Sequence, residues 1–352
     1  MVITNRLRRT LSAFNHSTRN WAPIPLRNAQ TTERISRVTS DTSQTPQRLS
    51  LISWNIDAFS SRAISRAKLI LNHVLEGQKY PDILFLQEVT TDVRTSLLND
   101  ERVRSAFLVT DAEDKTSFEN VPFATMTLLS RARFSPSSSL DSSAETGLGD
   151  ATVVEGRGSP DIMRVAGVSR LTLPSKYGRD ALYVDIVINC PIAPPGNGTT
   201  TPTVLRLINV HLDSLRHTAH YRAQQLEILA HSLVEPGYHG GIIAGDFNAI
   251  TPDDHALVDK NGLVDVWVAL HGGRAGPAAN GATWRVNAVD PGERRDGLGR
   301  GRLDKVVMKG LNLRAEEMEI LRPGIIEVPC PGEKSEVIPW SDHCGLRCTF
   351  TV

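Results

Sequence analysis

Five short motifs of polar and ionisable residues lie at the ends of apolar runs along this chain. They are Trp54-Asn55, Gln87-Glu88, His211-Leu212-Asp213-Ser214, Gly245-Asp246-Phe247-Asn248 and Ser341-Asp342-His343. Apolar runs of this length are typical of buried strands, and strand ends commonly carry active-site side chains. A single Asn or Glu in such a place is most often a turn or capping residue. The five motifs together predict an active site.

The carboxylate and amide groups of these motifs suit a metal ion. Glu88 offers the hard oxygen that Mg²⁺ prefers, and Mn²⁺ could substitute for Mg²⁺. Asn55 could bind the ion through its carbonyl oxygen or hold a metal-bound water, and Asp342 could assist at the metal. Breaking an anionic phosphoester needs charge neutralisation and an activated water. We therefore predict hydrolysis of a phosphoester with Glu88 as a metal ligand. The alternative for Glu88 alone is an ordinary surface salt bridge.

The Asp-x-Asn motif could handle the attacking water. Asp246 could orient or deprotonate this water, and Asn248 could hydrogen-bond a phosphate oxygen. Gly245 would allow a close approach of the backbone. A cationic His343 could stabilise the developing charge on phosphate if a carboxylate faced its other ring nitrogen. The alternative for Asp246 and Asn248 is an ordinary turn after a strand.

The order of the five motifs resembles the endonuclease/exonuclease/phosphatase superfamily, from about residue 49 to residue 352. Within it, the chain is most similar to the tyrosyl-DNA phosphodiesterase 2 subfamily. The segments that carry this closer resemblance are residues 53–57, 85–89, 211–214 with Arg222 and Gln225 on the following helix, 264–267, 283–284 and 341–346. The resemblance implies Mg²⁺-dependent hydrolysis of a 5′-phosphotyrosyl DNA bond, in one step by an activated water.

The resemblance also assigns residues outside the Asp-x-Asn motif. Asp304 occupies the place of the carboxylate that partners His343. His211 and Ser214 would donate hydrogen bonds to phosphate oxygens. Trp284 would lie near the substrate, where it could stack on a base or a tyrosyl ring. Each residue also has an ordinary structural alternative, such as partial core burial for Trp284.

One departure from the subfamily concerns an arginine. The relatives continue Asp-x-Asn with Leu-Arg-Asp, whereas Asn248 is followed here by Ala249-Ile250-Thr251, and Arg216 or Arg222 could replace the missing arginine. The substrate therefore has alternatives within the superfamily: an abasic site or other nuclease substrate, a poly(A) tail, a lipid phosphodiester or an inositol phosphate. A non-catalytic nucleic-acid-binding module is the alternative from another class, and the retained catalytic residue types disfavour it.

Strands that could position the motifs are expected at residues 49–55, 83–86, 123–129, 165–173, 182–189, 204–211, 242–244, 303–308 and 346–352. Helices are expected at residues 62–76 and 217–233, where apolar residues fall on one face. Residues 135–158 and 191–202 have the composition of loops. Many strands and few helices predict a four-layer α/β sandwich, with two packed mixed or antiparallel sheets flanked by helices, as in DNase I-like proteins.

Composition limits the partners. Lys plus Arg and Asp plus Glu each total 39, so binding to DNA must come from a local basic surface. A glycine-rich stretch that contains Arg294, Arg295, Arg300 and Arg302 is one candidate.

The four cysteines contain no C-x-x-C pair, which favours reduced thiols inside a cell. No apolar run approaches the roughly 20 residues of a membrane span. We expect a monomer that binds DNA and no membrane.

The N-terminal segment has a different composition from the rest. We expect residues 1–46 to be a disordered basic segment and residues 47–352 to be a single catalytic domain. Five arginines and no acidic residue precede Glu33, a bias typical of a mitochondrial targeting peptide, although a disordered basic tail has the same composition. We expect the nucleus as the site of action, with the mitochondrion as the alternative.

Overall fold

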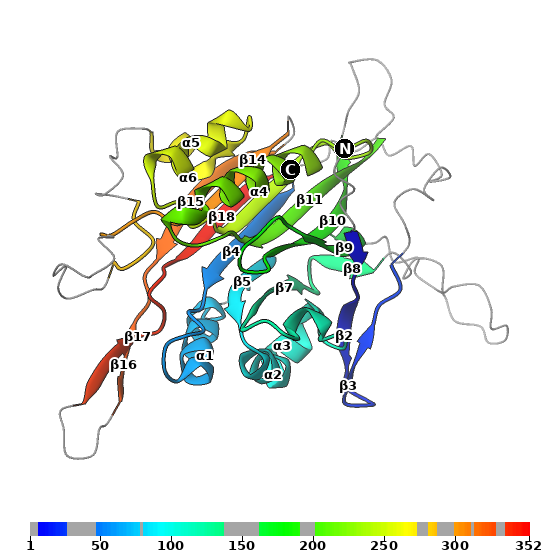
Figure 1. Ribbon diagram of the computed structural model, residues 1–352. Helices are drawn as coiled ribbons and strands as arrows, with labels where there is room; N and C mark the ends of the chain where they lie inside the picture. Colours follow the sequence, from blue (N-terminus) through cyan, green and yellow to red (C-terminus); the bar gives the residue numbers. More distant parts are fainter. Residues whose placement is uncertain are drawn as a thin grey trace.

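Two large sheets pack face to face in the computed structural model of the chain, which describes residues 6–26, 47–77, 80–136, 162–190, 201–272, 281–286, 299–310, 313–328 and 335–352. The expected loops at residues 135–158 and 191–202 lie almost wholly outside these residues. Figure 1 shows the sheets between two groups of helices. The predicted four-layer α/β sandwich is confirmed.

The first sheet has the order β1-β9-β10-β11-β12-β14-β13, with β8 also pairing with β9. Its strands are β1 (Arg6–Arg8), β8 (Phe134–Pro136), β9 (Met163–Thr172), β10 (Asp180–Cys190), β11 (Thr201–His211), β12 (Gly241–Asp246), β13 (Val264–Asp265) and β14 (Asp304–Lys309). The β11–β12 and β8–β9 pairs are parallel, and the other pairs are antiparallel.

The second sheet has the order β15-β18-β4-β5-β7-β6-β2-β3. Its strands are β2 (Leu11–Asn15), β3 (Asn20–Pro23), β4 (Arg48–Asn55), β5 (Ile83–Val89), β6 (Phe107–Thr110), β7 (Ala124–Ser130), β15 (Arg314–Leu321) and β18 (Gly345–Thr351). Only β4 and β5 run parallel among its pairs in the described residues. A separate ribbon of β16 (Ile325–Val328) and β17 (Glu336–Pro339) projects from the body (Figure 1).

Helices cover the outer face of each sheet. The second sheet carries α1 (Ala63–Val74), α2 (Thr91–Asn99) and α3 (Glu101–Ala106), and the first carries α4 (Ala219–Ser232) and α5 (Pro252–Lys260), with α6 (Val266–His271) nearby (Figure 1). None of the helices described is long and apolar enough to cross a membrane.

Side chains alternate between the two faces of the central strands. In β4, Leu49 and Leu51 enter the core between the sheets, while Ile52 and Trp54 enter the core under α1 and α2. A strand that is buried on both faces has apolar residues in succession rather than in alternation. This explains why the apolar runs predicted the central strands so well.

The expectation of a disordered N-terminal segment is wrong for residues 6–23. These residues form β1, β2 and β3, which pair with β9 and β6 far along the chain. Leu11 and Phe14 are buried, and Trp21 donates from Nε1 to the carbonyl oxygen of Leu98 at 3.2 Å. Short strands that depend on distant partners leave little periodicity in the sequence, which is why the pattern missed them.

The two sheets are joined by a buried polar contact as well as by apolar packing. Gln87 donates from Nε2 to Asn209 Oδ1 at 2.8 Å, from the second sheet to the first. Asn209 in turn donates from Nδ2 to the carbonyl oxygens of Met126 (2.9 Å) and Leu86 (3.3 Å). Both side chains are fully buried, and although Gln87 also donates to Ser53 of its own sheet at 3.2 Å, the Asn209 amide takes these hydrogen bonds from the other sheet.

We expect Asn209→Ala to lower the free energy of unfolding by about 2–4 kcal/mol, because it leaves buried donors and acceptors of both sheets without partners. Urea unfolding would measure the loss, with Asn99→Ala, at an exposed position of α2, as the control. Equal stability of the two variants would contradict this role for the bridge.

Candidate active site

Strand register brings three of the predicted residues together in the first sheet. In the parallel β11–β12 pair, His211 lies beside Asp246, and in the antiparallel β12–β14 pair Asp246 lies opposite Asp304. Adjacent strands are roughly 4.8 Å apart, so these side chains share one edge of the sheet. Each of them was predicted at a strand end, but only the register makes them neighbours.

Asn55 and Glu88 come from the second sheet. Asn55 ends β4 beside Gln87, and the register of β5 against β7 shifts between Leu86 and Val89. Glu88 lies in this bulge with a φ of 56°, a left-handed conformation that is uncommon for residues other than glycine. Such bulges often re-aim a side chain near an active site. Here the bulge places Glu88 within reach of Asn55.

Asn55 joins the site residues of the second sheet to those of the first. Its Nδ2 donates to Asp246 Oδ2 at 3.0 Å and to Glu88 Oε1 at 3.2 Å, while its Oδ1 accepts from the backbone N–H of Asp57 at 3.0 Å. The amide nitrogen therefore faces the carboxylates, whereas we had expected the carbonyl oxygen or a water to face a metal. A donor between two carboxylates offsets their mutual repulsion.

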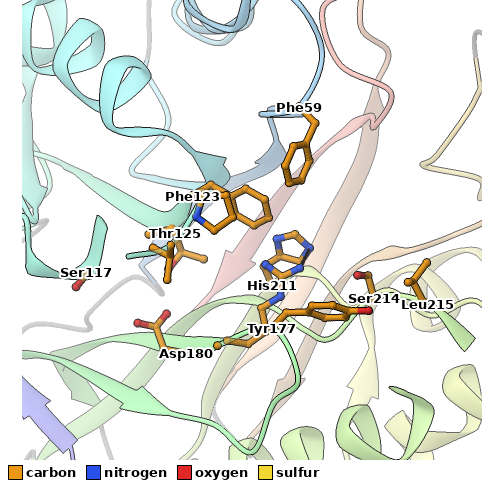
Figure 2. Close-up of a pocket in the computed structure, with 14 residues that line it drawn as sticks. Phe59, Ser117, Phe123, Thr125, Tyr177, Asp180, His211, Ser214 and Leu215 are labelled. Atoms are coloured by element: carbon orange, nitrogen blue, oxygen red, sulfur yellow. Dashed lines mark hydrogen bonds between the residues drawn. The ribbon is translucent and has the colours of Figure 1, made fainter. Parts of the chain in front are cut away.

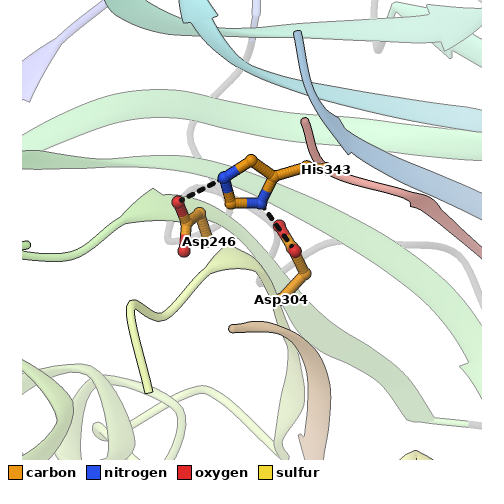
Figure 3. Close-up of side chains that lie close together, drawn as sticks. All are labelled: Asp246, Asp304 and His343. Carbon is orange, nitrogen blue, oxygen red and sulfur yellow. Dashed lines mark hydrogen bonds and ion pairs between the residues drawn. The ribbon is translucent and has the colours of Figure 1, made fainter. Parts of the chain in front are cut away.

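His343 lies between Asp246 and Asp304 (Figure 3). Its Nδ1 is 2.8 Å from Asp304 Oδ2, and its Nε2 is 3.8 Å from Asp246 Oδ2. Burial alone would lower the pKa of His343, but Asp304, Asp342 and Asp246 outweigh this effect and hold the pKa well above its ordinary value. The imidazole ring is therefore cationic at neutral pH, as the chemistry of a phosphoryl group requires.

Asp246 has the properties of a general base. Burial raises the pKa of its carboxyl group to about 7, with His343 opposing the shift and Asp304 adding to it. Oδ1 accepts from the backbone N–H of Asn248 at 2.8 Å. Gly245 precedes it with a φ of 145°, and a Cβ there would lie 1.9 Å from the carbonyl oxygen of Val210. Only glycine fits at this close approach.

Asn248 is held in the site by its backbone conformation and by a side-chain hydrogen bond. Its φ is 48°, which asparagine tolerates better than most residues. Its Nδ2 donates to the carbonyl oxygen of Leu212 at 3.0 Å. This bond ties the Asp-x-Asn motif to the motif that begins at His211.

The donor set of the site fits a hard divalent cation. Burial raises the pKa of Glu88, whose Oε2 accepts from the backbone N–H of Ala58 at 2.9 Å. Asp246, Asp304 and His343 each offer a ligand atom, all within 4.8 Å of one another. Asp304 and the cationic His343 already pair with each other, so Glu88 stays the predicted ligand of an ion at this site.

Trp284 and Asp342 form the rim beside His343. Trp284 donates from Nε1 to Asp342 Oδ2 at 2.8 Å, and Asp342 Oδ1 is 3.7 Å from His343 Nε2. The tryptophan ring is half-buried, and its centroid is 6.4 Å from that of His343. Trp284 therefore orients Asp342 and still presents part of its ring at the rim.

Arg66 of α1 fixes the backbone around the site, a role that no sequence motif predicted. The side chain is fully buried and donates to Asp57 Oδ2 (3.1 Å) and to the carbonyl oxygens of Trp340 (2.9 Å) and Ser61 (2.8 Å). It thereby ties the segment that follows Asn55 to the segment that precedes the Ser-Asp-His motif.

A cavity of about 340 Å³ opens beside the cluster of ionisable residues. Figure 2 shows the rings of Phe59 and Phe123 on one side and that of Tyr177 on the other. His211 and Ser214, both predicted, also line it. The aromatic residues were not predicted as site residues. Phe59 and Tyr177 lie in loops whose sequence has no periodicity, and Phe123 was expected only as the first residue of a strand.

Arg179 was also missed, and it is the cation of this cavity. Its Nη2 lies 3.1 Å from His211 Nε2, and its guanidinium lies over the ring of Phe123, 5.0 Å from the centroid. Burial, together with Arg179 and His343, holds the pKa of His211 well below its ordinary value, so His211 is neutral. The sequence Lys176-Tyr177-Gly178-Arg179 between two strands was the available signal: a basic, aromatic loop.

The prediction that Arg222 could replace the arginine missing after Asn248 is wrong. It pairs with Asp254 through two bonds, of 2.8 and 2.9 Å, and is buried with an exposed fraction of 1%. Arg216, the other candidate, is exposed in the turn before α4. Of the proposed basic loop, Arg302 pairs with Asp265 at 2.7 Å, while Arg294 and Arg295 lie outside the described residues.

The geometry is that of a phosphoesterase, and the comparisons with known proteins agree. The model of the endonuclease/exonuclease/phosphatase family matches residues 52–343. The chain belongs to this family of hydrolases. Among curated proteins, none matches the chain.

Solved structures with this fold include two TDP2 structures. TDP2 from D. rerio, complexed with single-strand DNA product, is 20% identical and has a TM-score of 0.56, over 87% of this chain and 99% of that one. Truncated TDP2 from Caenorhabditis elegans is 19% identical with a TM-score of 0.54, over 87% and 98%. The human Nocturnin catalytic domain is 18% identical with a TM-score of 0.50, over 87% and 95%. At these identities the likeness shows the fold alone.

We expect Asp304→Asn to lower kcat by about 10²- to 10⁴-fold with little change in KM, because His343 loses the carboxylate that keeps its ring charged and oriented. Steady-state kinetics on p-nitrophenyl thymidine phosphate would measure this loss. Asp92→Asn, at an exposed position of α2, is the control. An unchanged kcat would show that the Asp304–His343 pair has no part in the chemistry.

Proposed function

We propose that the protein is a Mg²⁺-dependent phosphodiesterase that hydrolyses 5′-phosphotyrosyl bonds of DNA, as in repair of trapped topoisomerase adducts. The observation that carries this proposal is the adjacency of two features. The charged cluster around Asp246 and His343 suits attack on a phosphodiester, and the neighbouring cavity lined by Phe59, Phe123 and Tyr177 suits an aromatic leaving group.

The catalytic roles follow from charge and position. Asp246, with a pKa of about 7, can accept the proton of the attacking water at neutral pH. The cationic His343, oriented by Asp304, would stabilise charge on the phosphoryl oxygens. Asn248 and Ser214 would donate hydrogen bonds to the remaining oxygens. Neutral His211, whose Nε2 accepts from Arg179, would orient that guanidinium. The reaction is a single displacement by water, without a covalent intermediate.

Glu88 would hold Mg²⁺, Asn55 would orient Glu88 through the hydrogen bond from its Nδ2, and Asp342 would be a second carboxylate near the ion. The bound ion would supply the charge neutralisation that an anionic phosphodiester needs. One carboxylate with mostly water around the ion is the usual protein environment of Mg²⁺. The same oxygen donors would accept Mn²⁺.

The lining of the cavity supports a tyrosyl group over other leaving groups. A phenol has a pKa near 10, so it leaves readily, and its ring gains from aromatic packing. Arg179 would face the charge that develops on the phenolate oxygen. An inositol or another polyhydroxyl group would instead need hydrogen-bonding side chains where Phe59, Phe123 and Leu215 lie.

We infer that the DNA end is the physiological partner, that the protein works as a monomer without a membrane, and that it works in the nucleus. A structure with this fold carries single-strand DNA product, which supports a nucleic-acid substrate. The absence of a net charge on the chain means that local cations such as Arg179 must attract the substrate.

We expect wild-type protein with Mg²⁺ to convert a 5′-phosphotyrosyl oligonucleotide to a 5′-phosphate end. EDTA or Glu88→Ala should reduce this turnover by at least about 10³-fold, because the ion and its carboxylate are lost. Gel mobility of the labelled strand measures the product, and Glu76→Ala, an exposed residue after α1, is the matched control.

An abasic duplex, a poly(A) oligonucleotide and an inositol phosphate, assayed in parallel, distinguish the alternatives. Turnover of only one of these would keep the metal site and refute the phosphotyrosyl assignment. Retention of full turnover in Glu88→Ala would refute the metal assignment. Binding of DNA with no turnover of any phosphoester would favour the non-catalytic module.

We expect Arg179→Ala to lower kcat/KM for the phosphotyrosyl oligonucleotide by about 10- to 100-fold, because a buried cation beside the leaving group is lost. Arg179→Lys keeps the charge without the planar guanidinium and should recover part of the loss. Arg131→Ala, at an exposed position outside the cavity, is the control. If Arg179→Ala retains wild-type kcat/KM, the cavity does not hold the leaving group.

A further inference from the structure

The N-terminal strap, which we define as residues 6–23, connects the edges of the two sheets. Strand β1 pairs with β9 of the first sheet, and β2 pairs with β6 of the second sheet (Figure 1). Only Arg9 and Thr10 lie between the two strands. The strap lies outside residues 52–343, the range that the family model matches.

Each half of the strap is anchored to its own sheet. Arg6 forms two hydrogen bonds with the carboxylate of Glu235, of 2.6 and 2.7 Å, on the side of the first sheet. Leu11 is fully buried in the core between the sheets, and Phe14 packs against Trp21 within the β2–β3 hairpin. Such anchoring at both ends holds the short linker between β1 and β2 in place.

Arg9, in that linker, binds the loop between β6 and β7. Its guanidinium lies 3.1 Å from Asp111 Oδ1, 2.8 Å from Asp114 Oδ2, 2.8 Å from Thr116 Oγ1 and 2.5 Å from Ser117 Oγ. The side chain of Arg9 is only 7% exposed. All four partners lie within seven residues of one loop, so one arginine fixes the conformation of that loop.

The loop that Arg9 binds forms a wall of the aromatic cavity. Ser117, a direct partner of Arg9, lines the cavity, and the same loop continues to Val121, Pro122 and Phe123, which also line it. Phe123 is the ring that stacks on His211 and lies under Arg179. The strap therefore contacts the lining of the cavity directly, through the hydrogen bond from Arg9 to Ser117.

A second connection runs through Asp111 and Arg170. Arg170 donates to Asp111 Oδ2 at 2.9 Å and to both oxygens of Asp180 at 2.9 and 3.0 Å. Asp180 lines the cavity and follows Arg179 in the chain. Burial alone would raise the pKa of Asp111, but Arg170 and Arg9 outweigh this effect and hold it below its ordinary value. Asp111 thus stays ionised between two guanidinium groups.

We propose that the N-terminal strap is part of the substrate-binding apparatus, and that Arg9 is the positioning residue through which it holds the β6–β7 loop against the cavity. The metal and general-base side of the site lies at the strand ends and does not depend on the strap. The proposal concerns whichever phosphodiester the cavity binds and does not require the leaving group to be tyrosine.

The test compares Arg9→Ala with Arg48→Ala in the full-length protein. Both variants remove one arginine that pairs with a carboxylate, but Arg48 of β4 pairs with Glu316 at 2.8 Å and lies outside the strap and the cavity lining. Hydrogen–deuterium exchange reports on the backbone of residues 111–123, and steady-state kinetics on p-nitrophenyl thymidine phosphate and the phosphotyrosyl oligonucleotide separates KM from kcat.

Arg9→Ala should speed exchange in residues 111–123 by about tenfold or more, because the loop loses its buried partner. It should raise KM by about five- to tenfold while kcat stays within about twofold, since only binding is affected. Arg48→Ala should leave both the loop and KM at wild-type values. If Arg9→Ala does not fold, Arg9→Lys, which keeps the charge but cannot reach all four partners, should give the same pattern at smaller size.

Wild-type exchange in residues 111–123 of Arg9→Ala, or equal effects of both variants across the whole protein, would overturn the proposal. A large fall in kcat of Arg9→Ala beside the rise in KM would also overturn the proposal, because it would show a general effect on the site rather than an effect on binding. Failure of the wild-type protein to turn over the phosphotyrosyl oligonucleotide would refute only the proposed substrate, since the exchange comparison does not use it.

Discussion

The two sheets pack through apolar side chains over most of their area, but at one end the contact between them is polar. There Asn55 bonds to Asp246, Gln87 bonds to Asn209, and His343, which precedes a strand of the second sheet, bonds to Asp304 of the first. Buried polar groups are costly unless each finds its partner. The same hydrogen bonds therefore hold the two sheets together and set the geometry of the site. A shift of either sheet would break these bonds and displace the site residues.

Charge balance at this polar end explains the unusual protonation of the site. The buried carboxylates of Glu88, Asp246 and Asp304 repel one another in a medium of low dielectric constant, while His343 and Arg179 supply compensating positive charge. The result is a raised pKa for Asp246 beside a histidine that stays protonated. A divalent cation bound beside Glu88 would complete this balance, so metal binding and catalysis make use of the same electrostatic arrangement.

Chemistry and recognition come from different parts of the fold. The strand ends are rigid and carry the residues that act on a phosphoryl group, whereas loops carry the side chains that line the cavity. Phe59 follows β4, Phe123 precedes β7, and Arg179 precedes β10. Loops vary more easily than strands without loss of the core. In this chain the N-terminal strap contacts one of these loops through Arg9, so a segment outside the matched residues 52–343 supports the lining of the cavity.

The sequence by itself determined the central strands, helices α1 and α4, and the five motifs at strand ends, because long buried strands and amphipathic helices leave apolar patterns that can be read locally. It also identified Glu88, Asp246, Asn248 and His343 as site residues. It did not predict that the amide nitrogen of Asn55, rather than its oxygen, faces the carboxylates. The tertiary structure alone decided the strap of residues 6–23, the buried Arg66, and the meeting of Arg179 with Phe123 and His211. Short strands and loop residues gain their stability from partners far along the chain, and no local pattern records which partners those are.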